Sequence, residues 1–285
     1  SLARPVEDVV MDGVTRPVSL DDDGRALVSL PELPDLDAVE RPGLDAAVAD
    51  DVTCPAWAEA AGRDAYGVWA SVRVGSVVFR MRWIEPGTAT IGSPPGEVGR
   101  AADEPERDVT FEEGFWMADT ATTQALWREA MGSAPSEFEG AEHPVEQVSW
   151  IDVQRFLAQL ADRVPGLEPV LPTEEAWEYA CRAGTRTATY AGDLGKYEEV
   201  EAAALDAIAW YGANSVGRTH PVATKAPNEW GLYDTLGNVS EWTSSGESSF
   251  RVLRGGAWGS EARYVRAANR NALPPDSRRT YIGVR

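Results

Sequence analysis

The chain has 285 residues, of which 43% are hydrophobic and 9% aromatic, and its formal net charge is -20. This apolar content supports a folded chain with a large core and excludes general disorder. The acidity argues against nucleic acid and anionic membranes as partners, because the long-range field repels a polyanion. No apolar run approaches the roughly 20 residues that span a bilayer, and no signal segment is recognisable. We therefore expect no membrane span and favour a cytoplasmic location.

The charge is unevenly distributed. Residues 1–60 carry fourteen Asp or Glu against four Arg, whereas residues 251–285 carry eight Arg against two acidic residues. We expect most of the C-terminal arginines to be structural partners of buried carboxylates and carbonyls rather than a phosphate-binding patch. Arg263, Arg266 and Arg270 are predicted to be buried, with Glu241, Asp234 and Asp276 as their partners.

The first 53 residues differ in composition from the rest. They are rich in Asp, Pro and Ala, and their apolar residues show little periodicity. This predicts an acidic arm or linker over residues 1–53, with no more than one short strand pair. The arm could connect the chain to other domains or subunits, and residues 54–285 are predicted to form the main domain.

Local patterns predict a few regular elements in the main domain. Residues 71–83 alternate around Gly75 and predict a β-hairpin, and residues 109–117 predict a strand. Three helices are predicted: one from Gln124 to Met131, one after Ser149 that ends near Pro165, and one after Thr173 that stops at Gly184. Beyond Gly184 no long regular element is predicted, so aromatic packing and side-chain bonds to loop backbone should hold that region.

Several longer motifs occur in order along residues 78–285: Met81–Gly87 with Ile91–Ser93, Glu104-Pro105, Pro144–Trp150, Leu171–Ala180, Gly231–Trp242 and Arg254–Trp258. Together they resemble the formylglycine-generating-enzyme family. The resemblance implies an α+β, C-type-lectin-like fold with little regular secondary structure. It does not by itself imply an activity, because the family includes oxidases, sulfoxide synthases and binding proteins.

The catalytic residues of the family are missing from this sequence. The resemblance implies a pair of copper-binding cysteines after the Gly-Gly-aromatic motif, yet Gly259–Arg270 contains no cysteine. Cys181 falls in a predicted helix, where a small buried apolar role is expected. His143 and His220, the two histidines, each precede Pro-Val in a loop and cannot supply the several histidines of the iron-dependent members. We predict that the protein is not an enzyme and requires no cofactor.

The last part of the chain, residues 255–285, resembles the variable region of proteins encoded by diversity-generating retroelements. Short motifs alternate there with positions of unrelated chemistry, and these motifs are Arg254–Trp258, Ala262-Arg263, Val265–Arg270, Pro275-Asp276, Arg278 and Ile282–Arg285. The predicted variable, ligand-binding positions are Gly259, Ser260, Glu261, Tyr264, Asn271, Ala272, Leu273, Pro274, Ser277, Arg279, Thr280 and Tyr281. Tyrosines among small polar residues resemble antibody combining loops, which favours a protein ligand.

The family resemblance also allows a calcium ion at Asn238 and Glu241, since these side chains offer hard oxygen ligands. The alternative is that Asn238 caps a turn and Glu241 pairs with an arginine.

The first functional hypothesis is a non-enzymatic binding protein with a diversified C-terminal site. The alternatives are an inactive enzyme-like sensor or interaction domain of a larger bacterial protein, and an oxidase of unrecognised type.

Overall fold

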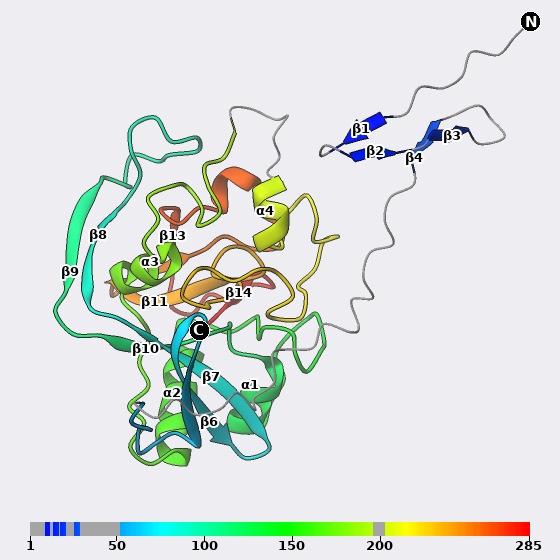
Figure 1. Ribbon diagram of the computed structural model, residues 1–285. Coiled ribbons are helices and arrows are strands. Elements are labelled where there is room, and N and C mark those ends of the chain that lie inside the picture. The colour runs from blue at the N-terminus through cyan, green and yellow to red at the C-terminus, as the bar shows by residue number, and fades with distance from the viewer. Residues whose placement is uncertain (1–8, 12–13, 17, 21–25, 29–51, 196–202) are drawn as a thin grey trace, which may run out of the picture. The chain divides into compact units, whose positions relative to one another are not determined.

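The computed structural model describes residues 52–195 and 203–285, together with the backbone of four short strands near the N-terminus (Figure 1). Two compact units are present, residues 1–46 and residues 47–285. In the first unit, β1 (Val9–Met11) pairs with β2 (Val14–Arg16), and β3 (Val18–Leu20) pairs with β4 (Ala26–Val28), both antiparallel. The sequence predicted no more than one such pair. The rest of the predicted arm lies outside the described residues.

The second unit contains a four-stranded antiparallel sheet in the order β10-β7-β6-β5. Its strands are β5 (Ala60–Asp64), β6 (Gly67–Val74), β7 (Val77–Ile84) and β10 (Phe115–Ala118). The predicted hairpin is confirmed as β6 and β7, and its turn contains Gly75 at a φ of 56°. The predicted strand over residues 109–117 is wrong as one element, because it divides into β9 (Arg107–Phe111) and β10. β9 pairs with β8 (Gly87–Ile91) in a separate ribbon.

The three predicted helices are confirmed as α1 (Gln124–Met131), α2 (Trp150–Arg163) and α3 (Glu174–Arg182). Each has a side-chain N-cap: Thr123 for α1, Ser149 for α2 and Thr173 for α3. Ser149 and Asp152 form a reciprocal capping box, which fixes the first turn of α2. A short helix, α4 (Ala203–Ile208), follows later.

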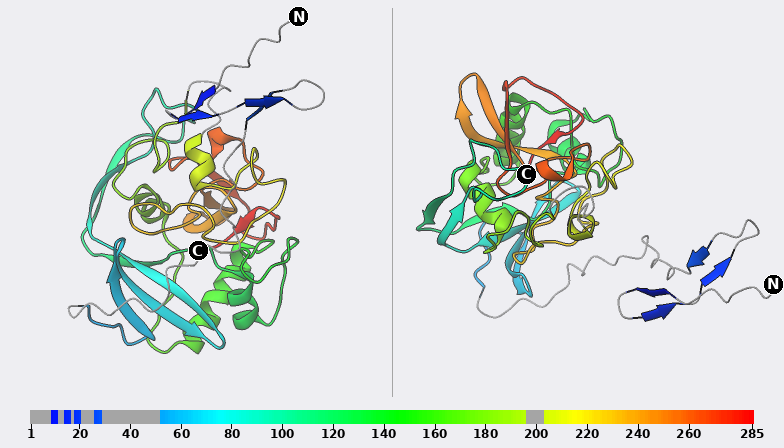
Figure 2. Two further views of the ribbon diagram at one scale, coloured as in Figure 1. Left: turned by 45° about the vertical axis from the view of Figure 1, so that its right-hand side comes forward. Right: turned by 90° about the horizontal axis from the view of Figure 1, so that it is seen from above.

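A second four-stranded sheet, in the order β13-β12-β11-β14, organises the C-terminal part (Figure 2). β11 (Ser240–Glu247) and β12 (Phe250–Arg254) form an antiparallel hairpin that the sequence did not predict. β13 (Arg270–Leu273) lies at the edge against β12, and β14 (Ile282–Gly283) runs parallel to β11. The chain after β12 therefore returns twice to the same sheet.

One main apolar cluster joins the two sheets to helices α1 and α2. It combines side chains of β6, α1 and α2 with Trp242 of β11 and Leu253 of β12. The Trp242 side chain is fully buried, and its indole N–H donates to the Val148 carbonyl at 2.9 Å. The second sheet is thereby fixed to the segment that leads into α2.

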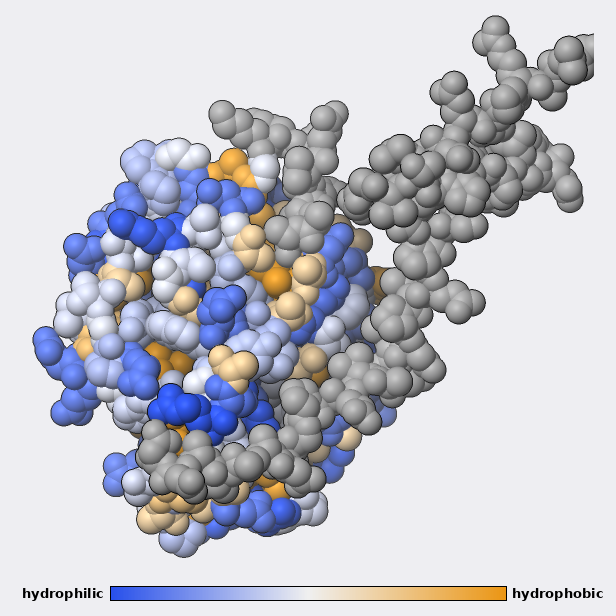
Figure 3. All heavy atoms as spheres, viewed as in Figure 1, coloured by the Kyte–Doolittle hydropathy of each residue, from blue (hydrophilic) through white to orange (hydrophobic). Residues whose placement is uncertain are grey.

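The visible surface is polar for the most part. On the face shown in Figure 3, apolar residues are scattered among hydrophilic ones, in keeping with the net charge of -20. Within the described ranges, the helices are all too short or too polar to cross a bilayer.

Candidate ligand-binding site

The predicted variable segment forms two loops that are anchored in the second sheet. The first loop, residues 255–269, leaves β12 and returns to β13; the second loop, residues 274–281, leaves β13 and returns to β14. The first loop contains a single 3-10 turn, Ala262–Tyr264. Both loops therefore begin and end at hydrogen-bonded strands, which limits the movement of the residues between them.

Burial along these loops follows the predicted pattern only in part, because the motif residues Arg263, Asp276 and Arg278 are exposed. Arg254–Ala257, Val265–Ala268 and Ile282–Arg285 are buried. None of the twelve predicted binding positions is buried. The exposed ones are Gly259, Glu261, Tyr264, Asn271, Ala272, Pro274 and Arg279, and the half-buried ones are Ser260, Leu273, Ser277, Thr280 and Tyr281.

The second loop is held mainly through its own carbonyl groups. The Arg279 carbonyl accepts from the Gln147 N–H at 3.0 Å, and the Tyr281 carbonyl accepts from the Ser240 N–H at 2.8 Å. These bonds do not depend on the side chains of Arg279 and Tyr281. The side chains of such a loop can therefore be replaced while its backbone conformation stays the same. Leu273 and Tyr281 are partial exceptions, because both also pack against the main apolar cluster.

Trp258 connects the two loops. Its indole N–H donates to the Thr280 carbonyl at 2.9 Å, and its own carbonyl accepts from the Ser215 hydroxyl at 2.7 Å. The Phe138 ring meets the Trp258 ring edge to face, with centroids 5.4 Å apart. The exposed positions on either side of Trp258 therefore belong to one surface.

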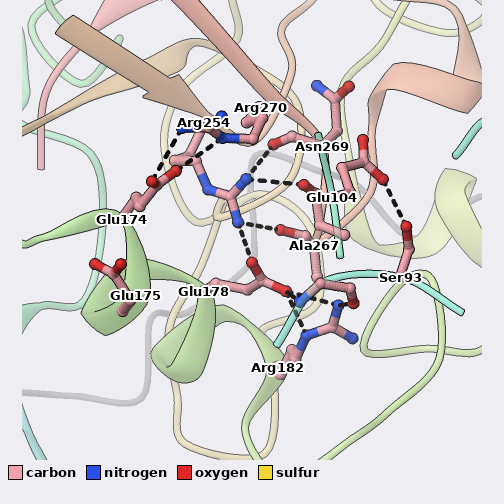
Figure 4. A network of polar contacts seen from close by, with 12 residues as sticks. Ser93, Glu104, Glu174, Glu175, Glu178, Arg182, Arg254, Ala267, Asn269 and Arg270 are labelled. Atoms are coloured by element: carbon pink, nitrogen blue, oxygen red, sulfur yellow. Dashed lines mark hydrogen bonds and ion pairs between the residues drawn. The ribbon is translucent and has the colours of Figure 1, made fainter. Parts of the chain in front are cut away.

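A buried arginine, Arg254, holds the return of the first loop (Figure 4). Its guanidinium donates to the carbonyls of Ala267, Ala268 and Asn269 at 2.7 to 2.9 Å and forms an ion pair with Glu178. Glu178 also pairs with Arg182 at 2.7 Å. Because Arg254 contacts three successive carbonyl groups, this part of the loop is fixed without any contribution from the exposed side chains.

Arg266 anchors the middle of the first loop. It is fully buried and donates to both carboxylate oxygens of Glu104 at 2.9 Å, to Glu97 and to the Gly99 carbonyl. Burial alone would raise the pKa of Glu104, but the hydrogen bonds from Arg266 and Ser93 lower it. Burial raises the pKa of Glu97 despite the same partner.

Other arginines of the segment depart from the prediction. The Arg263 side chain is 53% exposed, pairs with Glu261 and lies over the Tyr264 ring, so it belongs to the exposed surface. Arg270 is half-buried and pairs with Glu174. The partners also differ from those predicted. Three acids were predicted as partners: Glu241, Asp234 and Asp276. Among the hydrogen bonds of the described residues, arginine bonds reach only Glu241, and they come from Arg285.

The Asn238 and Glu241 side chains are committed to protein partners. Glu241 accepts from the Trp177 indole at 2.7 Å and from Arg285 at 2.9 to 3.2 Å. Asn238 bonds both backbone groups of His220 at 3.0 to 3.1 Å. These contacts match the alternative of a capped turn and an arginine pair. With a guanidinium on Glu241, the two residues do not fit a calcium ligand set.

The Cys181 thiol is buried, and the two histidines are hydrogen-bonded to neighbouring groups. Burial raises the pKa of the Cys181 thiol to about 12, so it stays protonated and unreactive. His143 pairs with the Thr219 hydroxyl at 3.1 Å and His220 with the Ser215 carbonyl at 2.8 Å. In the parts of the chain that the structure describes, no three His, Cys, Asp or Glu side chains are placed to hold a metal ion.

Two parts of the chain outside residues 255–285 also contact the site, although no local sequence pattern indicates it: residues 212–216 and Phe138. Residues 212–216 contact the first loop through the Gly212 N–H, which donates to the Ser260 carbonyl at 2.8 Å, and through Ser215. Val216 is 88% exposed and has a φ of 54°, which is rare for a β-branched residue. The Phe138 ring packs against the Trp258 ring. Residues 212–216 and Phe138 lie beside the predicted binding positions only because the fold brings together residues that are far apart in the sequence.

Glu146 lies directly behind the second loop, next to Gln147. Its side chain is fully buried; Oε1 accepts from the Phe138 N–H at 2.9 Å and Oε2 has no hydrogen-bond partner. Burial raises the pKa of Glu146 to about 7 from 4.5, and the nearby Glu137 carboxylate adds to the shift. The neutral acid is therefore the form that the fold favours.

This shift predicts a pH-dependent contribution to stability. Because the folded pKa of Glu146 is the higher one, its contribution is complete below pH 4.5 and is lost as pH rises to about 7. The loss is about 3 kcal/mol at 1.36 kcal/mol per pKa unit. Glu146→Gln should therefore raise the melting temperature relative to wild type more at pH 8 than at pH 5. Glu139→Gln, at an exposed position of the same segment, is the control; an equal gain at both pH values would contradict the assignment.

Comparison with known proteins agrees with this fold. Residues 76–285 match the model of the sulfatase-modifying factor enzyme 1-like domain. The inactive C-alpha-formylglycine-generating enzyme 2 of Bos taurus is 32% identical over 185 residues, which cover 57% of this chain and 56% of that protein. The formylglycine-generating enzyme of Mycobacterium tuberculosis is 38% identical over 130 residues, 42% of this chain and 40% of the enzyme. The chain thus spans about half the length of these relatives.

Two solved structures resemble nearly the whole of the main domain. Treponema denticola variable protein 1 is 28% identical, with a TM-score of 0.63 over 76% of this chain and 97% of that one. PvdO from Pseudomonas aeruginosa is 26% identical, with a TM-score of 0.65 over 75% of this chain and 95% of that one. With the family match over residues 76–285, these similarities place the chain in the formylglycine-generating-enzyme family, with the C-type-lectin-like fold that the motifs predicted.

Proposed function

We propose that the protein is a non-enzymatic ligand-binding protein whose twelve predicted C-terminal binding positions are diversified by a retroelement. The observation that carries the proposal is a difference in burial within residues 255–285. The motif segments 255–257, 265–268 and 282–285 are buried, whereas every predicted binding position is exposed or half-buried. The likeness to a variable protein from Treponema denticola supports it.

A protein ligand suits the side chains of this surface. Tyr264 is 43% exposed, and Tyr281 is half-buried beside Thr280. Tyrosine presents a large rigid contact area at low entropic cost, and small polar neighbours adapt their hydrogen bonds to a partner. Arg279 adds an exposed guanidinium group to this surface, and arginine is among the residues that contribute most to protein–protein binding.

The chemistry of the chain favours binding over oxidation. Residues 255–285 contain no cysteine, and the thiol of Cys181 is buried with a raised pKa. A copper site of the kind implied for the oxidases needs an accessible thiolate as its soft ligand. Some relatives carry the name of an inactive enzyme and others that of an active one. The choice between binding and oxidation therefore rests on the residues of this chain.

The relative named as inactive favours a second candidate, an enzyme-like interaction domain without diversification. The coding DNA separates the two. Diversification requires a near-copy of the sequence for residues 255–285, altered only at adenines, beside a reverse transcriptase gene. A complete genome without such a copy would exclude the retroelement.

The proposal also makes a direct prediction about stability. Ala272 is an exposed binding position, whereas Ala268 is 2% exposed in the framework only four residues earlier. Ala272→Tyr should change the free energy of unfolding by no more than about 0.5 kcal/mol. Ala268→Tyr overfills a packed site and should cost about 3 kcal/mol or more. Urea denaturation of both variants tests the contrast, and similar losses would contradict an interchangeable position 272.

A further inference from the structure

A cavity of about 540 Å³ lies in the main domain and includes none of the twelve binding positions. Its walls come from β7, β10, α2 and the loop of residues 166–173. Side chains that line it include Trp57, Met81, Trp116, Phe156 and Leu160. The volume lies within the range of roughly 300 to 1,000 Å³ that is typical of small-molecule sites.

The lining is mostly apolar, and the residues that the structure describes place no unpaired charge in its interior. Two charged residues line the cavity, Arg285 and Glu168. The Arg285 guanidinium is already bonded to Glu241 and to the carbonyls of Ala118 and Tyr233. Glu168 is exposed, so its carboxylate lies at the rim rather than in the interior. A buried charge on a ligand would find no partner there.

The rim carries apolar side chains that the fold itself does not cover. Val170 is 78% exposed although it lines the cavity, and Trp57 and Trp116 are half-buried and meet edge to face at 5.5 Å. Apolar side chains left facing a cavity without partner atoms lose dispersion contacts that a ligand would restore. Exposed apolar side chains at the mouth of a cavity are typical of ligand-binding grooves.

We propose that this cavity binds one uncharged amphiphile with a long alkyl chain, of the chemical class of long-chain alcohols. The alkyl chain would lie among the aromatic and aliphatic walls, and the uncharged hydroxyl would remain at the rim. A carboxylate head group would be repelled by Glu168 and by the net charge of -20, which selects against fatty acids. The site is separate from the proposed binding surface, so either proposal can fail alone.

Titration of the intact chain with the neutral dye Nile red, followed by displacement with dodecanol, tests the inference. We expect saturable dye fluorescence, displacement by dodecanol, and at least tenfold weaker displacement by dodecanoate at pH 8. Absence of saturable binding would overturn the cavity assignment. Equal displacement by the alcohol and the carboxylate would overturn the proposed selectivity for an uncharged head group.

Variants locate the bound dye. Ala176 lines the cavity, so Ala176→Phe should lower affinity at least tenfold, whereas Ala161→Phe on an exposed part of α2 should leave it unchanged. Val170→Asp at the exposed rim should also weaken binding several-fold, and it tests the site even if Ala176→Phe does not fold. Wild-type affinity in a folded Ala176→Phe variant, or in Val170→Asp, would overturn the location.

Discussion

Arg266→Ala is expected to lower the free energy of unfolding of the main domain by about 3 to 5 kcal/mol, because it leaves buried carboxylates without their cation. Arg266 contacts Glu104 and Glu97, and both acids lie more than 160 residues earlier, with sequence separations of 162 and 169. For a domain of this size the loss corresponds to about 10 °C in melting temperature. Thermal unfolding monitored by circular dichroism measures it.

Arg263→Ala provides the matched control, since the same residue type stands three positions earlier with its side chain 53% exposed. Its pairing with Glu261 is a surface contact and should be worth less than about 1 kcal/mol. A second readout is the pH dependence. Without Arg266 the pKa of Glu104 should rise above its unfolded value and the pKa of Glu97, which burial already raises, should rise further, so the loss of stability should shrink from pH 8 to pH 5. Equal melting temperatures for the two alanine variants would refute the anchoring role.

The contrast between Arg263 and Arg266 shows what the sequence could predict. The helices carry their own signals, such as the capping box at Ser149 and the cap at Thr173, and these depend on neighbours within a few residues. The environment of Arg266 depends instead on Glu97 and Glu104, which no local pattern connects to it. The order of the family motifs predicted the fold, but not these partners.

The hairpin of β11 and β12 was missed for a related reason. Ser240–Glu247 has one large apolar residue, Trp242, and several small polar ones, so its alternation is weak. It becomes a strand through pairing with β12 and through burial of Trp242 in the main cluster. The exposed positions of the two loops could be predicted because the family motifs between them are recognisable in the sequence. Their neighbours, residues 212–216 and Phe138, could not be found without the fold.

Glu178→Gln should be about as destabilising as Arg266→Ala, but of the two binding loops only the first should be affected. The Glu178 carboxylate accepts from Arg182 and the Gly92 N–H at 2.8 Å and also binds Arg254. A neutral amide leaves two buried guanidinium groups with one acceptor fewer, at a cost of about 3 to 5 kcal/mol. Glu175→Gln, whose partner Arg107 is 46% exposed, should cost less than about 1 kcal/mol.

Hydrogen exchange distinguishes a local effect from general destabilisation. Arg254 holds the carbonyls of Ala267, Ala268 and Asn269, so weakening its pair with Glu178 should release the amides of residues 267–269 first. The second loop should keep its protection, because it is also held by the N–H groups of Gln147 and Ser240 and by the pair of Arg278 with Asp152. If Glu178→Gln accelerates exchange equally in both loops, the ion pair is a general stabiliser. Loss confined to the first loop would show that the bonds holding the second loop do not depend on the pair of Glu178 with Arg254, so that the second loop can keep its conformation when the first one loosens.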